Sequence, residues 1–145
     1  MNCVDTPLLE QLLDGDASAD LWLNFVERSG EEVCTTEANL LELEILSERR
    51  GTNGVRQRTL ALDRLRGSVT VLPMVPSVSR IVGQFFRRKG PTSDKPQGRR
   101  KTGARDPFLL SLIFGIALHH GVTTFLTTHP TEREARRRGL RVKIL

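Results

Sequence analysis

Three acidic residues that lie far apart in the chain each occupy a position where a carboxylate could do chemistry. Asp5 follows a short apolar run, and Asp106 stands directly before Pro107 and a long uncharged run. Glu42 falls on the apolar face of an expected helix. Carboxylate oxygens are hard ligands that suit Mg²⁺ or Mn²⁺, and such an ion can hold a phosphodiester and lower the pKa of a water. If the fold brings the three acids together, they predict metal-dependent cleavage of a phosphodiester.

Each of these acids also has a purely structural interpretation. Asp5 fits a turn or helix cap at the end of a strand, and Asp106 fits an N-cap ahead of Pro107. Glu42 fits an ion pair at the edge of the core. The sequence leaves these alternatives open, although the joint occurrence of all three acids favours a shared site.

Glu42 is set apart from the other glutamates by the periodicity of the helix expected over residues 36–50. At about 100° per residue, one face collects apolar side chains around Glu42, and these are Ala38, Leu41, Ile45 and Leu46. The glutamates on the opposite, solvated side are Glu37, Glu44 and Glu48. Because an unpartnered carboxylate on a buried face is costly, Glu42 is expected to need a cation, a hydrogen-bond donor or a proton.

Short apolar runs that predict strands alternate along the chain with segments of helical periodicity. The expected strands lie at residues 2–4, 33–35, 69–72, 123–126 and 141–145, the last at an edge of the sheet. The uncharged run 108–118 predicts a buried core helix, well short of the roughly 20 residues that cross a bilayer. This alternation indicates an α/β fold with a mostly parallel sheet, in which sites form beyond the carboxyl ends of strands. Asp5 and His129 both leave strands at that end.

The length of 145 residues and the hydrophobic content of 38% fit a single domain, residues 1–145. The N-terminus shows neither the basic stretch nor the long apolar run of a signal peptide, so we expect a cytoplasmic protein without a membrane anchor. Cys3 and Cys34 lie in strand-like runs, which predicts small buried hydrophobes rather than a disulfide or a zinc site.

The net charge of +5 is concentrated in one segment, residues 87–105, which carries eight Lys or Arg against the single Asp94. The rest of the chain is mildly acidic. The segment has no apolar periodicity, so we interpret it as a basic mobile loop. Such a loop could bind a polyanion such as RNA or DNA by neutralising phosphates. It could equally be a solvated loop that its charge keeps soluble.

Four segments of the chain resemble the PIN-domain ribonucleases, and within them the VapC-type toxins of bacteria and archaea. They are Val-Asp-Thr at 4–6, Asn-Leu-Leu-Glu-Leu at 39–43, Gly-Ala-Arg-Asp-Pro-Phe-Leu-Leu at 103–110 and Phe-Leu-Thr-Thr-His at 125–129. The segments come in the order found in that family and span nearly the whole chain.

This resemblance implies a three-layer α/β/α sandwich with an acidic pocket that cleaves RNA internally with Mg²⁺ or Mn²⁺. Asp5, Glu42 and Asp106 would be the catalytic, metal-binding acids, and the hydroxyls of Thr6 and Thr127 would support them. The resemblance also implies a cognate antitoxin as partner, with a homodimer as the expected assembly.

Two features depart from the family pattern. His129 stands where the family often has a further Asp or Asn, and it could bind a metal through a neutral nitrogen or simply turn the chain ahead of Pro130. The basic loop also looks long for a compact toxin, which suggests an RNA-gripping arm. Its candidate phosphate contacts, which would not read sequence, are Arg99, Arg100, Lys101 and Arg105.

The leading hypothesis is therefore a metal-dependent endoribonuclease, the toxin of a toxin–antitoxin pair. The alternative is a PIN-like protein with a degraded site that binds RNA or a partner without cleaving. A phospho-acceptor or nucleotide-binding α/β domain is less favoured, because no glycine-rich phosphate loop follows the first strand.

Overall fold

A computed structural model describes residues 1–65, 69–87, 105–128 and 139–144 of the chain. Its centre is a five-stranded sheet of order β3-β2-β1-β4-β5, in which every pairing is parallel. The strands are β1 (Asn2–Val4), β2 (Val33–Thr36), β3 (Val69–Leu72), β4 (Thr124–Thr127) and β5 (Arg141–Ile144). The expected mostly parallel sheet is confirmed, with β5 at an edge as predicted.

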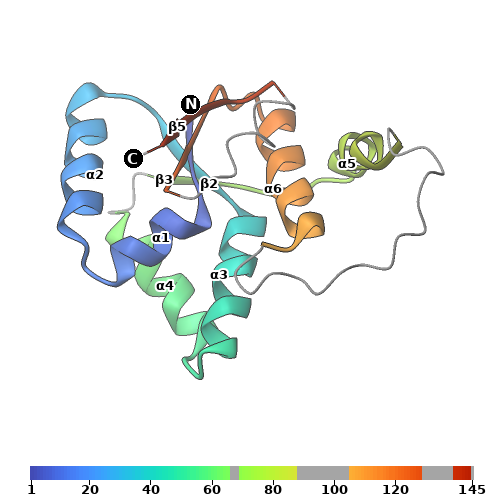
Figure 1. Cartoon of the computed structure of the whole chain (residues 1–145). Helices are drawn as coiled ribbons and strands as arrows, with labels where there is room; N and C mark the ends of the chain where they lie inside the picture. Colours follow the sequence, from blue (N-terminus) through green and yellow to red (C-terminus); the bar gives the residue numbers. More distant parts are fainter. Residues whose placement is uncertain (66–68, 88–104, 129–138, 145) are drawn as a thin grey trace.

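Helices cover both faces of this sheet and make the three-layer α/β/α sandwich that the resemblance implied (Figure 1). The first four are α1 (Thr6–Leu13), α2 (Ala17–Ser29), α3 (Glu37–Arg49) and α4 (Gly54–Arg64). The last two described are α5 (Val78–Arg87) and α6 (Pro107–His119). Helices α5 and α6 lie on one side of the sheet, and α1, α2 and α4 lie on the other (Figure 1).

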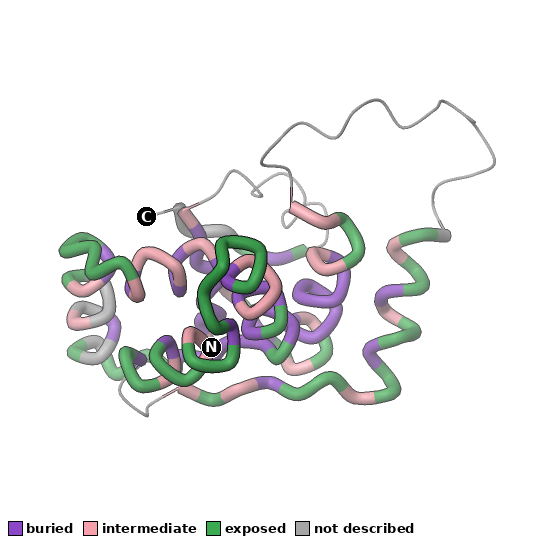
Figure 2. Tube along the Cα trace, turned by 90° about the horizontal axis from the view of Figure 1, so that it is seen from below, coloured by how far each residue is buried: buried purple, intermediate pink, exposed green. Residues whose placement is uncertain are grey.

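The strands supply alternate residues to two hydrophobic cores, one on each face of the sheet. In β1, Cys3 belongs to the core under α5 and α6, whereas Val4 belongs to the core under α1 and α4. Phe125 and Leu126 of β4 divide in the same way, because successive side chains of a strand point to opposite faces. The buried residues therefore gather in the middle of the molecule, with exposed residues on the outer helices (Figure 2).

Helix α6 is the buried core helix that its uncharged sequence predicted. Every residue of the stretch 111–117 is buried. Phe114 packs edge-on against Phe125 of β4, with ring centroids 5.2 Å apart. No helix within the described ranges is long and apolar enough to span a membrane.

The buried face of α3 is rotated relative to the face expected from periodicity. Leu41, which was placed on that face, is 44% exposed, whereas Leu40 and Leu43 are buried. The reason is that Leu40 and Leu43 belong to the core shared with α1 and α4, which turns that side of α3 inward. Glu42 stays within the buried face after this correction.

Candidate active site

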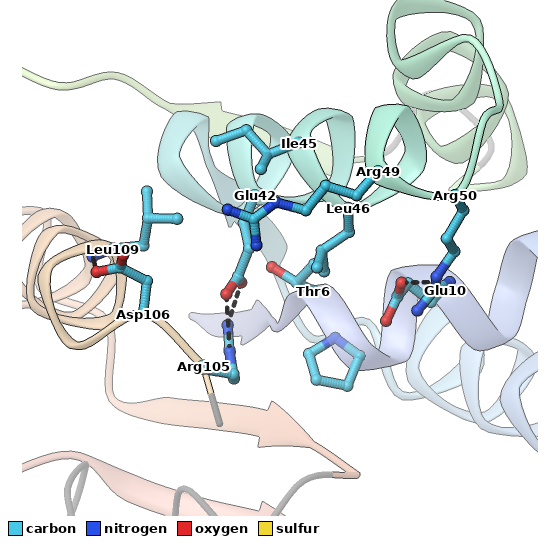
Figure 3. A pocket seen from close by; sticks show the side chains of 11 residues that line it. Thr6, Glu10, Glu42, Ile45, Leu46, Arg49, Arg50, Arg105, Asp106 and Leu109 are labelled. Atoms are coloured by element: carbon cyan, nitrogen blue, oxygen red, sulfur yellow. Dashed lines mark hydrogen bonds and ion pairs between the residues drawn. The ribbon is translucent and has the colours of Figure 1, made fainter. Parts of the chain in front are cut away.

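Polar side chains meet at the carboxyl ends of β1, β2 and β4, the three central strands of the sheet. Two of these side chains, Thr6 and Glu42, line a pocket of about 520 Å³ together with Arg105 (Figure 3). Asp5 follows β1, α3 follows β2 directly, and Thr127 is the last residue of β4. Because the strands are parallel, Asp5, the start of α3 and Thr127 come together at the carboxyl ends of the strands, as expected for an α/β site.

Asp5 is fully buried and is held by donors from three different elements. Its Oδ1 accepts hydrogen bonds from the Thr6 backbone N–H at 2.8 Å and from Asn39 Nδ2 at 3.0 Å. Its Oδ2 accepts one from the Thr127 hydroxyl at 2.8 Å. Asp5 is thus the N-cap of α1 and also the centre of the polar cluster, so the structural and the functional interpretation of this residue are compatible.

Asn39 is a site residue that sequence reasoning missed. Its backbone N–H donates to the Thr36 hydroxyl at 3.0 Å, and that hydroxyl donates to Asn39 Oδ1 at 2.6 Å. Because Asn39 Oδ1 accepts this hydrogen bond, its Nδ2 is oriented toward Asp5 and Thr6. Nδ2 donates to Asp5 Oδ1 and, at 3.1 Å, to the Thr6 hydroxyl. An asparagine three residues after a threonine N-cap, at the start of a helix that follows a buried strand, is the sequence signal that could have identified it.

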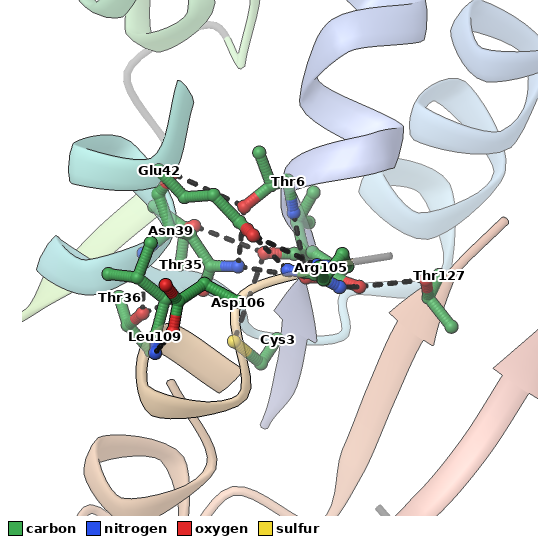
Figure 4. Close-up of polar contacts among 12 residues, drawn as sticks. Cys3, Thr6, Thr35, Thr36, Asn39, Glu42, Arg105, Asp106, Leu109 and Thr127 are labelled. Carbon is green, nitrogen blue, oxygen red and sulfur yellow. Dashed lines mark hydrogen bonds and ion pairs between the residues drawn. The ribbon is translucent and has the colours of Figure 1, made fainter. Parts of the chain in front are cut away.

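Arg105 binds both of the buried acids, Asp5 and Glu42. Figure 4 shows its side chain at the centre of the polar cluster, next to Glu42. Its Nη1 donates to Asp5 Oδ2 at 2.5 Å and its Nη2 to Asp5 Oδ1 at 2.8 Å. Its Nε donates to Glu42 Oε1 at 3.0 Å, and Nη2 also contacts Glu42 Oε2. The side chain of Arg105 is only 8% exposed. Burial alone would lower the pKa of Arg105, but the two carboxylates outweigh it and raise that pKa above its ordinary value.

Glu42 is 3% exposed and forms an ion pair with Arg105. The expectation that it needs a charged or hydrogen-bonding partner is confirmed, and the partner is Arg105. Arg105 itself was predicted to contact RNA phosphates. The structure instead directs its guanidinium to two buried carboxylates, because these would be costly to leave unpaired. A phosphate-binding role for Arg105 stays a prediction.

Asp106 caps α6, and this is the structural interpretation that the sequence left open. Its Oδ1 accepts hydrogen bonds from the backbone N–H groups of Phe108 at 2.8 Å and Leu109 at 3.4 Å. Asp106 borders the same pocket as Glu42 and Arg105. Among the residues that the structure describes, however, no three acidic, histidine or cysteine side chains are grouped closely enough to hold a metal ion. Arg105 connects Asp5 with Glu42, and the metal role of Asp106 stays a prediction.

One face of α3 forms a wall of the pocket. Glu42, Ile45, Leu46 and Arg49 line it at helical spacing, and Arg49 extends along the helix toward Glu42 (Figure 3). Farther along, Arg50 forms an ion pair with Glu10 at 2.8 Å. The pKa of Glu10 is raised, because its burial outweighs the opposing effect of Arg50. The pocket thus combines an acidic edge, an apolar wall and arginine side chains.

The remaining candidate residues, His129, Arg99, Arg100 and Lys101, lie outside the described residues, as does most of the basic segment 87–105. Thr6 and Thr127 were predicted as supporting hydroxyls, and both lie in the polar cluster. Thr127 donates to Asp5, and the Thr6 hydroxyl donates to the backbone carbonyl of Asn39 at 3.3 Å.

The architecture of the sheet and its helices is the VapC-type PIN-domain fold. Solved structures of that class superpose over nearly the whole chain. VapBC2 from Rickettsia felis, bound to a promoter DNA fragment, matches with a TM-score of 0.69 at 13% identity, covering 99% of this chain and 98% of its own. FitAB bound to DNA matches with a TM-score of 0.63 at 15% identity, covering 99% and 94%.

A further match is VapC20 of Mycobacterium tuberculosis, a toxin that cleaves the sarcin–ricin loop, with a TM-score of 0.53 at 21% identity. It covers 86% of this chain and 87% of its own. The sequence matches no family model and no curated protein. At these identities the likeness establishes the fold, and the activity has to be argued from the site.

Proposed function

We propose that this chain is a Mg²⁺- or Mn²⁺-dependent endoribonuclease, acting as the toxin of a toxin–antitoxin pair. The observation that carries the proposal is that Asp5 and Glu42, both buried, converge on one cation position beside an open pocket. Buried carboxylates are retained at a cost in free energy unless a cation compensates them. Their position at the carboxyl ends of parallel strands is where α/β proteins place their active sites.

The chemistry of the donors fits the proposed ion. Asp5 and Glu42 offer carboxylate oxygens, the ligands that Mg²⁺ and Mn²⁺ prefer. We propose that Asp106 adds a third carboxylate from the start of α6, as the sequence predicts. A bound ion would supply a Lewis acid that neutralises charge on a phosphate and lowers the pKa of an attacking water.

The protein's own groups orient these carboxylates and shape the space for RNA. Asn39 and Thr127 donate to different oxygens of Asp5, which fixes the rotation of its carboxylate. The apolar side chains of Ile45 and Leu46 offer a surface for a base, and Arg49 offers a cation for a phosphate. These walls support a single-stranded RNA segment as substrate.

Cleavage of RNA by the purified protein, with Mn²⁺ or with a chelator, tests this proposal. We expect Asp5→Asn to lower the cleavage rate about 100-fold or more, because metal-dependent stabilisation is worth several kcal/mol. Glu44→Gln is the control, since it also neutralises one carboxylate, but Glu44 pairs with Arg58 and does not line the pocket. Circular dichroism would establish that both variants are folded. Cleavage that survives the chelator, or that Asp5→Asn leaves unchanged, would contradict the proposal.

The second candidate is a protein that binds RNA or a partner without cleaving it. The occupation of the cation position by Arg105 favours this candidate. Binding of RNA that weakens with added salt, without cleavage in Mg²⁺ or Mn²⁺, would support it over the nuclease.

We also propose an antitoxin protein as the physiological partner, in the cytoplasm, with a homodimer of this chain as the assembly. Structures with the same fold include VapBC2 and FitAB complexes bound to DNA, which supports a partner of this kind. Purification of the chain together with the product of a neighbouring reading frame would test the partnership.

A further inference from the structure

Arg105 uses every carboxylate oxygen of the buried pair. Its guanidinium contacts Oδ1 and Oδ2 of Asp5 and Oε1 and Oε2 of Glu42. A divalent ion held by this pair would need oxygens from the same four atoms. The guanidinium and the ion therefore cannot both be bound in the arrangement that the structure shows.

We infer that Asp5 and Glu42 form a single cation site for which Arg105 and a divalent metal ion compete, so that Arg105 sets the metal affinity. The inference rests on the proposed function only in taking Mg²⁺ or Mn²⁺ as the second cation.

The charges of the cluster favour such an exchange. Two carboxylates face one guanidinium, so these three groups together carry one net negative charge, whereas a divalent ion would neutralise the two carboxylates. Arg105 cannot give up its proton to leave the site. It has to move away as a charged group, and the pocket that it borders offers space for the displaced side chain.

The competition has a measurable consequence for metal binding. An ion that binds only while Arg105 is displaced has an apparent affinity reduced by the fraction of molecules in that state. Suppose that Arg105 is displaced in a fraction of the molecules between about 1% and 10%. Removal of the arginine side chain then raises the affinity for Mn²⁺ roughly 10- to 100-fold. Arg105 therefore lowers the apparent affinity of Asp5 and Glu42 for Mn²⁺.

Mn²⁺ binding, measured without RNA by calorimetry and by the electron paramagnetic resonance signal of free Mn²⁺, tests the inference. We expect Arg105→Gln to bind Mn²⁺ about tenfold or more tightly than the unchanged protein. Arg58→Gln is the matched control, because it also removes an arginine paired with a glutamate of α3, at 3.1 Å, but away from the pocket. An affinity of Arg105→Gln equal to or weaker than that of the unchanged protein would overturn the inference.

Two further variants keep the test decisive if Arg105→Gln does not fold without metal. Arg105→Lys keeps the positive charge but loses the planar fork that contacts both acids, so we expect a smaller gain in Mn²⁺ affinity. No gain in Arg105→Lys would again contradict the inference. In the double variant Glu42→Gln with Arg105→Gln the gain should disappear, because one of the two carboxylates is gone.

Guanidinium ion provides an independent probe. In Arg105→Gln, millimolar guanidinium chloride should weaken Mn²⁺ binding, whereas sodium chloride at equal ionic strength should weaken it less. Equal effects of the two salts would contradict a site shaped for a guanidinium.

The outcomes separate this inference from the proposed activity. A gain in Mn²⁺ affinity without RNA cleavage by any variant would uphold the competition and defeat the nuclease proposal. Mn²⁺-dependent cleavage by the unchanged protein, with no change of affinity in Arg105→Gln, would do the reverse.

Discussion

At the scale of single residues, the centre of the site is a buried carboxylate held by several uncharged donors besides Arg105. Asp5 gathers hydrogen bonds from Thr6, Asn39 and Thr127, and these come from α1, α3 and β4. Hydrogen bonds to charged groups contribute about 1.5–3 kcal/mol each, and losing one leaves a buried oxygen unsatisfied. The orientation of Asp5 is therefore a joint property of three elements.

A matched pair of substitutions at Thr127 measures how much its hydrogen bond to Asp5 contributes to stability. We expect Thr127→Val to lower the free energy of unfolding by about 2 kcal/mol, because it removes the hydroxyl that donates to Asp5 and keeps the shape. Thr127→Ser keeps the hydroxyl and should cost only about 0.8 kcal/mol for the lost methyl group. Urea denaturation would measure both values. Equal losses in the two variants would mean that the hydrogen bond contributes little.

At the scale of elements, the close packing of α5 on α6 depends on a glycine. A Cβ at Gly115 of α6 would lie 2.6 Å from Val82 Cγ2 and 3.3 Å from Val78 Cγ1 of α5. Both valines belong to the core under these helices. Valine is stiff about χ1, so it cannot easily move aside. The two helices can approach this closely because position 115 has no side chain.

We expect Gly115→Ala to destabilise the protein by about 1 kcal/mol, because overpacking at about 1–3 kcal/mol exceeds the gain of about 1 kcal/mol in helix propensity. Gly83→Ala on α5 is the control, since a Cβ there meets nothing within 4 Å and should stabilise the helix by up to about 1 kcal/mol. Thermal unfolding would compare the two. The cost of Gly115→Ala should shrink in a Val82→Ala background, and an unchanged cost would show that the two residues are not coupled.

At the scale of the whole molecule, the sheet carries a buried thiol on each of two neighbouring strands. Cys3 and Cys34 are paired in the register of β1 and β2, and both are fully buried and free. The prediction of small buried hydrophobes without a disulfide is confirmed. The contact with Cys34, together with burial, raises the pKa of Cys3, so its reactive thiolate form is scarce.

These thiols should report on global unfolding. We expect a thiol reagent at neutral pH to label native protein very slowly, since labelling has to wait until the central strands open. In unfolding concentrations of urea both thiols should react at once. The labelling rate should rise with urea as the unfolded population rises. Rapid labelling of either cysteine in buffer alone would show that the sheet opens locally at β1 or β2.

The order of strands and helices, the parallel sheet and the buried helix α6 could all be predicted from the sequence, because they depend on local periodicity and on capping residues. The same local patterns marked Asp5 and Glu42, each at a position where a carboxylate needs a partner. Only the tertiary structure decided what that partner is. Arg105 lies 100 positions from Asp5 and 63 from Glu42, and no local pattern encodes contacts across such separations. The face of α3, the role of Asn39 and the arginine between the two acids were likewise decided when neighbouring elements packed together.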